Sequence, residues 1–330
     1  MNDPLPAGPI LARPPQGAIP RRMRRWRPAV VLGAGASFVA AAALVGPAAF
    51  GAAPVWATLA AMALYLTAHL LRAARLAIVA SALLGVSART TGLLHFATAP
   101  FVMLVPLKLG EGVRLHQLWV AGRRAPGAVI ALLIDRTLDA VMLLALLISL
   151  SLSGQSLDGG AATVLWLTGA AAAAAGVAFV IGPRACASLQ RYVVVHHRRR
   201  TSLRGLPFID TLRRSLTEGA ALLRKQGAAL LVISVLIWGM ELAAAALFAT
   251  WALTPELRDA GVLLVTRTTQ EWRAATGAGV DPALAASAAA SLLVLLAVWP
   301  VALYVYISRL DAEPLRRTRA SDLPEGADGP

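Results

Sequence analysis

The stretch PLKLGEGVR, residues 106–114, places one proline, two glycines and three charges between hydrophobic runs. A broken apolar segment, 92–107, leads into it, and a long apolar run follows it. Its charged residues recur at every third position, so a helix would bring them to one side: Lys108, Glu111 and Arg114. A charge at bilayer depth is costly unless it pairs or faces water, which makes this stretch a candidate functional site. A solvated loop with ordinary charges is the alternative reading.

Composition predicts the class of protein around this stretch. The chain is 58% hydrophobic and 15% charged, with a mean hydropathy of +0.67, whereas soluble domains are about 25% charged. Several apolar runs reach the roughly 20 residues that a membrane-spanning helix needs. We therefore expect an all-α polytopic membrane protein. Because the chain has one cysteine, Cys186, it has no internal disulfide framework.

The charge balance is strongly basic, with 31 Lys and Arg against 17 Asp and Glu. In a soluble protein such an excess would suggest nucleic acid. Here the basic residues lie between and beside the apolar runs, where membrane topology and anionic headgroups explain them better. The run from His196 to Arg200 is interpreted in the same way, and no nucleic-acid partner is expected.

Hydropathy divides the chain into a membrane domain and two polar ends. The ends, 1–27 and 308–330, are too polar and too rich in proline, glycine or charge to fold alone, so we expect them to be disordered. The membrane domain, 28–307, contains a basic cytoplasmic connector with an amphipathic stretch at 184–226. Six spans are predicted within it, at about 28–49, 55–80, 128–152, 161–182, 227–252 and 283–307.

The distribution of Lys and Arg predicts the orientation. If the 92–107 segment enters and leaves on the cytoplasmic side, 28 of the 31 basic residues lie inside. If that segment crossed fully, the basic 184–226 connector would lie outside, against the positive-inside rule. A re-entrant element and cytoplasmic N- and C-termini are therefore expected. A second broken element, 254–281, lies in the other half with the opposite orientation, which predicts an inverted repeat of the kind found in transporters.

The charged stretch also resembles a known family. Pro106, Gly110, Glu111 and Arg114 match the pattern P-G-x-x-G-E-x-x-R of the bacterial lysylphosphatidylglycerol synthase transmembrane-region family, also called flippase-like membrane proteins. Leu107 stands where that family prefers glycine.

Further positions match the family in the same order, and the likeness covers about residues 55–305. They are Arg75 with Arg72 near the end of the second span, Arg136 and Asp139 at the start of the next, and Glu241 in a later span. In the second half the sequence offers Glu271, within TRTTQEWRAATGAGV (266–280), without the proline and glycine neighbours usual in the family.

The resemblance implies lipid handling in the cytoplasmic (inner) membrane of a bacterium. Relatives join this membrane region to a soluble aminoacyl-transferase domain, and the membrane region moves the aminoacylated phospholipid to the outer leaflet. No stretch after residue 307 is long enough for such a domain, so synthase activity is not expected. The expected function is translocation of an anionic or aminoacylated phospholipid, or of a polyprenyl-linked lipid.

The residues support that reading in physical terms. Four cations are candidates for binding a phosphate: Arg72, Arg75, Lys108 and Arg114. Four carboxylates would balance them, or bind an amino headgroup: Glu111, Asp135, Asp139 and Glu241. Because Asp135 and Asp139 are four residues apart on one helix, they repel unless a cation lies between them. Gly110 permits close backbone approach, and Pro106 frees backbone groups at the break.

Other readings stay open. In a structural reading, Arg72 and Arg75 reach the cytoplasmic membrane interface with their long side chains. Asp135, Arg136 and Asp139 then form an ion-pair network that fixes helix packing. The sequence lacks the common metal and nucleotide motifs, so neither an enzyme nor a cofactor is expected. The alternatives are a membrane-embedded transferase with Glu111 or an aspartate as base, and a non-transporting partner of a lipid-synthesis complex.

Overall fold

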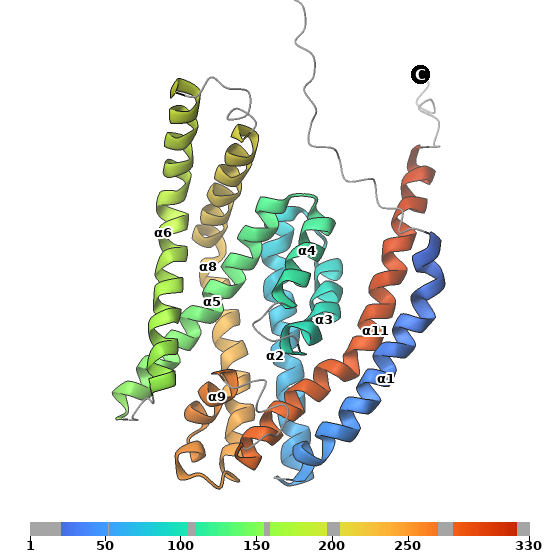
Figure 1. Ribbon diagram of the computed structural model, residues 1–330, viewed down its shortest axis with the longest axis vertical. Coiled ribbons are helices and arrows are strands. Elements are labelled where there is room, and N and C mark those ends of the chain that lie inside the picture. The colour runs from blue at the N-terminus through green and yellow to red at the C-terminus, as the bar shows by residue number, and fades with distance from the viewer. Residues whose placement is uncertain are drawn as a thin grey trace, which may run out of the picture.

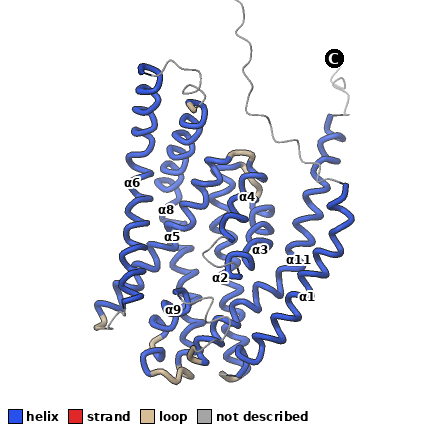
Figure 2. Tube along the Cα trace, in the orientation of Figure 1, coloured by secondary structure: helices blue, strands red, loops and turns tan. Residues whose placement is uncertain are grey.

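The computed structural model describes residues 21–51, 53–104, 110–154, 159–196, 205–269 and 280–321. These ranges form helices joined by short loops and contain no strand (Figure 2). The helices are α1 (Arg21–Gly51), α2 (Val55–Leu84), α3 (Ala88–Leu104), α4 (Gly110–Gly122), α5 (Ala125–Leu152), α6 (Gly159–His196), α8 (Leu206–Ala249), the 3₁₀ turn η2 (Pro255–Arg258), α9 (Ala260–Thr269) and α11 (Pro282–Ser321).

Four of the described helices are long and apolar enough to cross a membrane: α2, Trp166–His196 within α6, α8, and Pro282–Ser308 within α11. Helix α5 has 28 residues and is also largely apolar. It carries the charges of Asp135, Arg136 and Asp139 near its centre, which separates it from the other four. The expected all-helical membrane protein is therefore confirmed.

The long helices run along the long axis of the molecule (Figure 1). In that view the connections from α2 to α3 and from α4 to α5, the end of α6 and the start of α8 lie at the upper end. The end of α1, the start of α2 and the loop from α8 to α9 lie at the lower end. Helix α1 begins and α11 ends at the upper end, so the two described termini share one side.

Helices α3 and α4 form a short antiparallel hairpin beside the upper half of α2 (Figure 1). Gly85, in the left-handed conformation at φ 66°, ends α2 and lets the chain turn into α3. Helix α3 runs through Pro100 without the interruption that the sequence suggested. At the start of α4, a Cβ added to Gly110 would lie 2.2 Å from the carbonyl oxygen of Phe101, so the two helices meet where only glycine fits.

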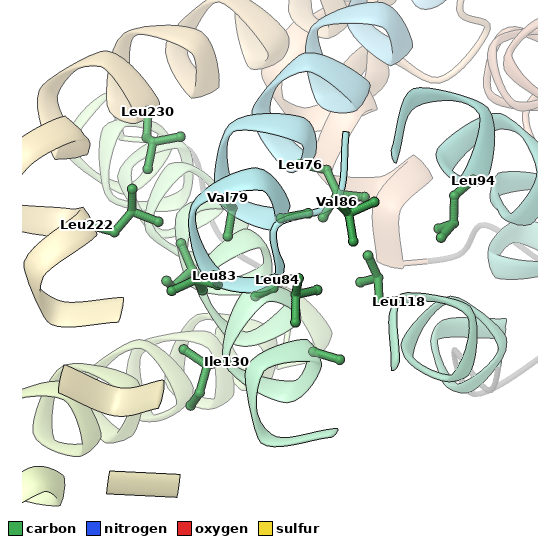
Figure 3. Packing of buried hydrophobic residues seen from close by; sticks show 14 of the residues in the cluster. Leu76, Val79, Leu83, Leu84, Val86, Leu94, Leu118, Ile130, Leu222 and Leu230 are labelled. Atoms are coloured by element: carbon green, nitrogen blue, oxygen red, sulfur yellow. The ribbon is translucent and has the colours of Figure 1, made fainter. Parts of the chain in front are cut away.

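An apolar cluster joins the hairpin to the long helices. Leu76, Leu83 and Leu84 of α2 pack with Leu94 of α3 and Leu118 of α4, and side chains of α5 and α8 complete the cluster (Figure 3). A second cluster, around the buried Phe248 and many alanines of α8 and α11, fills the other end of the bundle. The small residues allow close helix contact, as is typical of helices packed in membranes.

Polarity is inverted relative to a soluble protein. Large apolar side chains are exposed on the outer helices, among them Leu44, Trp166, Val180 and Val301, whereas several charged side chains are buried inside. Hydrocarbon can cover the outer surface, and the inner charges pair with one another. Both observations are those of a membrane protein.

The connector and the two polar ends differ from their expected bounds. Much of the 184–226 connector is helical, because α6 continues to His196 and α8 already begins at Leu206. Figure 1 shows these extensions projecting beyond the other helices. The polar ends are shorter than expected, since α1 begins at Arg21 and α11 runs to Ser321; both segments are rich in arginine and other good helix formers. Of the broken element 254–281, residues 270–279 lie outside the described residues.

Candidate functional site

Arg75 ties three helices together inside the bundle. Its side chain is fully buried on α2. It donates to the Asp135 carboxylate at 2.9 Å and to the Asp139 carboxylate at 2.7 Å on α5, and to the Ser234 hydroxyl at 2.9 Å on α8. The two aspartates, which repel each other at this spacing, share this cation, as the sequence required. Arg75 therefore does not extend to the interface; its donors are occupied by the protein itself.

A looser group lies at the hairpin. Glu111 and Arg114 of α4 and Arg136 of α5 meet through a single carboxylate oxygen, Oε1 of Glu111. That oxygen lies 3.4 Å from Arg114 and 3.5 Å from Arg136, whereas charge-assisted hydrogen bonds are about 2.7–2.9 Å long. Arg114 also donates to the hydroxyl of Thr98 at 3.5 Å. The two guanidinium groups are thus only weakly held around this carboxylate.

This group also carries polar atoms without partners. Oε2 of Glu111 and Nε of Arg136 are buried and have no hydrogen-bond partner among the described residues. Arg136 keeps firm contacts on its other side, at 2.7 Å to Asp135 and 3.1 Å to Asp139, and its side chain remains 37% exposed. Buried polar atoms are nearly always satisfied in native proteins, so these vacancies suit a further polar ligand.

A third group, toward the lower end of the bundle, is centred on Glu241 of α8. Its carboxylate accepts from Arg72 of α2 and, at 2.6 Å, from Arg267 of α9. Arg267 also lies over the ring of Tyr65, 4.7 Å from its centroid, and the Tyr65 hydroxyl is 2.8 Å from that of Ser287. Glu241 thus joins α8 to the first half of the chain through Arg72 and to α9 through Arg267.

The structure brings nine of the predicted site residues into these three groups or their immediate surroundings. They are Arg72, Arg75, Gly110, Glu111, Arg114, Asp135, Arg136, Asp139 and Glu241. Pro106, Lys108 and Glu271 lie outside the described residues. Sequence reasoning missed Arg267, which the predicted topology counted among the three basic residues on the non-cytoplasmic side. The available signal was that Arg267 lies two residues after the apolar run 261–265.

The buried positive and negative charges of the site nearly balance. Five arginines face four carboxylates in the described network, so the described charges leave one positive charge in excess. Such a site attracts an anion without holding a large uncompensated charge in the bilayer. Within the described part of the chain, no three His, Cys, Asp or Glu side chains are grouped as metal ligands would be.

The arginines differ in how free they are to bind a ligand. Arg75 is fixed by four hydrogen bonds to side chains and backbone of α5 and α8. Among the described residues, Arg114 has two long contacts, to Thr98 and Glu111, and can exchange them at little cost. The geometry therefore suits binding of a phosphate or carboxylate between Arg114 and Arg136, in the place now taken by Glu111. Comparison of the chain with protein-family models, with curated proteins and with solved structures gives no match.

Proposed function

We propose that this protein moves an anionic or aminoacylated phospholipid, or a polyprenyl-linked lipid, between the leaflets of the cytoplasmic membrane. The observation that carries the proposal is the loosely paired group of Glu111, Arg114 and Arg136 inside a membrane protein. An anionic headgroup cannot cross hydrocarbon alone, and paired, exchangeable charges inside the bundle lower the cost of its passage. The resemblance to flippase-like membrane proteins agrees with this function.

The topology proposed with this function has six spans, with α1 and α5 added to the four helices that are long and apolar enough to cross a membrane. The α3–α4 hairpin would be re-entrant from the cytoplasm, and both termini would be cytoplasmic in a bacterial inner membrane. The hairpin's length supports this, since α4 has 13 residues, about 20 Å of helix, too short to cross about 30 Å of hydrocarbon. Helix α9, at the opposite end of the bundle, would belong to the inverted counterpart.

In the proposed cycle, a lipid phosphate displaces Glu111 from Arg114 and Arg136 and gains two charge-assisted contacts. Glu111 then competes for the same arginines and returns when the headgroup leaves. A carboxylate is well suited to this exchange because it carries the same charge sign as the ligand. Lipid can thus bind and leave without two bare guanidinium groups being left inside the membrane.

The test is leaflet transfer in liposomes. Purified protein is reconstituted with acyl-labelled fluorescent phosphatidylglycerol, and dithionite bleaching reports the label reaching the outer leaflet. Arg114→Ala removes one phosphate contact and should slow transfer about 10- to 100-fold, the equivalent of one charge-assisted hydrogen bond. Glu111→Ala should also stop turnover, because bound lipid then has no competitor.

Arg124→Ala is the matched control. Arg124 stands in the α4–α5 turn and pairs with Glu218 at the surface, at 3.3 Å. Its loss should leave transfer unchanged. Normal transfer by folded Arg114→Ala and Glu111→Ala would refute the site, and no transfer of any anionic lipid by the wild type would refute the function.

A membrane-embedded transferase is a second candidate, favoured by the unpartnered Oε2 of Glu111. A buried carboxylate oxygen without a donor is free to accept a proton from a lipid-linked substrate. The two functions differ at Glu111→Gln. A transferase should lose product formation in that variant while lipid still binds, and it should not move unmodified lipid between leaflets.

A further inference from the structure

Two histidines lie side by side in the interior, outside the ion pairs described above. His69 on α2 is 8% exposed and His95 on α3 is 3% exposed. Their ring centroids are 5.9 Å apart, with the planes tilted by 44°. Nδ1 of His69 and Nε2 of His95 are buried without a hydrogen-bond partner among the described residues. Two unsatisfied ring nitrogens at one place are costly for a purely structural pair.

The pair bridges the two ends of the charged network. His69 stands one turn before Arg72, which pairs with Glu241. His95 stands one turn before Thr98, whose hydroxyl accepts from Arg114. The histidines therefore occupy the interval between the loosely held hairpin group and the Glu241 group.

The charged side chains that act on the pair come from five helices. They are Arg72 of α2, Arg114 of α4, Asp135 of α5, Glu241 of α8 and Arg267 of α9. Helix α11, which also packs on α3, presents the neutral indole of Trp299, whose N–H donates to the carbonyl of Ala97 at 3.0 Å. Arginines outnumber carboxylates in this environment.

We infer that the His69–His95 pair binds one proton together with the anionic headgroup, so that lipid movement is coupled to proton movement. This inference rests on the proposed function and names its coupling ion. Histidine is the side chain that ordinarily exchanges protons near neutral pH. In the empty site, burial away from water and repulsion by Arg72 and Arg114 both disfavour a proton on the pair. A phosphate bound at Arg114 cancels part of that repulsion, and the proton then has a stable place.

The coupling is reciprocal by thermodynamic necessity. If the headgroup favours proton binding, the proton favours headgroup binding by the same factor. One linked proton changes lipid affinity by at most about tenfold per pH unit. A proton gradient across the membrane would then bias the direction of lipid movement without any nucleotide.

A metal site explains the pair less well. Zinc sites use at least three protein ligands, and no third His, Cys, Asp or Glu joins the two histidines among the described residues. Aromatic packing alone does not explain why both residues are histidines, because two phenylalanines would fill the same space without buried ring nitrogens that need partners.

The first experiment measures leaflet transfer of acyl-labelled phosphatidylglycerol in liposomes clamped at pH 6, 7 and 8 on both sides, with a trapped pH dye. Wild-type transfer should rise several-fold from pH 8 to pH 6 and should follow an imposed pH gradient. His69→Asn and His95→Asn should transfer lipid with no pH dependence and no dye response. His116→Asn is the matched control, since His116 is exposed on α4, and it should behave as wild type.

The second experiment measures proton uptake directly. Dioctanoyl phosphatidylglycerol is titrated calorimetrically into the detergent-solubilised full chain, in buffers of different ionisation enthalpy. The wild type should take up close to one proton per lipid, and His69→Asn, His95→Asn and the more conservative His69→Gln should take up none. This readout requires binding but no transport, and size-exclusion profiles establish that each variant is folded.

The outcomes separate the two hypotheses. Transfer or binding by the wild type without pH dependence or proton uptake would overturn the coupling and leave the proposed function standing. Wild-type-like proton uptake in both folded asparagine variants would overturn the assignment to this pair. Failure of the wild type to bind or move any anionic lipid would overturn the proposed function, and the coupling with it.

Discussion

Replacing Arg75 by methionine should be the most damaging single change to stability in the described network. Arg75 is fully buried and makes four hydrogen bonds, two of them to the carboxylates of Asp135 and Asp139. Methionine cannot pair with either carboxylate, so Asp135 and Asp139 keep Arg136 alone as a paired cation among the described residues. Removing one partner of a buried ion pair costs about 3–5 kcal/mol, most of it the penalty of the charge left behind.

The assay is unfolding in mixed micelles by titration with sodium dodecyl sulfate, followed by tryptophan fluorescence. Arg75→Met should lose about 3–5 kcal/mol, whereas Arg124→Met should lose at most about 1 kcal/mol. The Arg124–Glu218 pair is a fitting comparison because its side chains are 39% and 43% exposed. Adding Asp135→Asn and Asp139→Asn to Arg75→Met should restore part of the loss, since amides need no cation. Equal costs for the two methionine variants, or no recovery on adding the amides, would refute the reasoning.

Three further predictions concern stability. Gly110→Ala should cost about 1–3 kcal/mol of stability, because its Cβ would meet a backbone carbonyl of α3. Gly112→Ala should change the stability by at most about 0.5 kcal/mol, because its Cβ would meet open space. Titration of both variants in mixed micelles measures this difference. Glu241→Gln should cost about 3–5 kcal/mol in that assay by leaving two arginines without their shared carboxylate, and a loss below about 1 kcal/mol would contradict the pairing. Partial burial would raise the pKa of Asp281, but hydrogen bonds from Thr254 and nearby backbone groups lower it below the ordinary carboxyl value. The Asp281 carboxylate therefore contributes fully to stability above about pH 4, and this contribution is lost as the pH falls further. Thermal unfolding of Asp281→Asn between about pH 3 and 7 should lack that acid-dependent loss.

The helices and much of the site could be predicted because the bilayer imposes strong rules. Apolar runs of about 20 residues define spans directly, and charges within them need partners. The spacing of Asp135 and Asp139 demanded a cation, and Arg75 supplies it. The glycine of the hairpin was expected to allow close backbone contact, and Gly110 does so against Phe101.

What the sequence did not predict depends on contacts between distant segments. Arg267 was assigned to the broken element without a partner, because Glu241 lies 26 positions earlier on another helix. His69 and His95 are also 26 positions apart, and neither has a spacing motif that would reveal the other. The helical extensions of α6 and α8 were missed because hydropathy detects where an apolar run ends and does not detect where a helix ends.

Placement of the short elements adds a last argument for passage through the interior. Helix α4 and helix α9 are the two described α-helices of 13 residues or fewer, and they lie at opposite ends of the bundle (Figure 1). Each carries one buried arginine inward: Arg114 from α4 and Arg267 from α9. Both arginines act electrostatically on the same buried His69. Buried arginines that reach one titratable pair from both ends are the arrangement that the proposed alternating access would use. A structural ion-pair network would need neither the opposite placement nor the unsatisfied atoms between its halves.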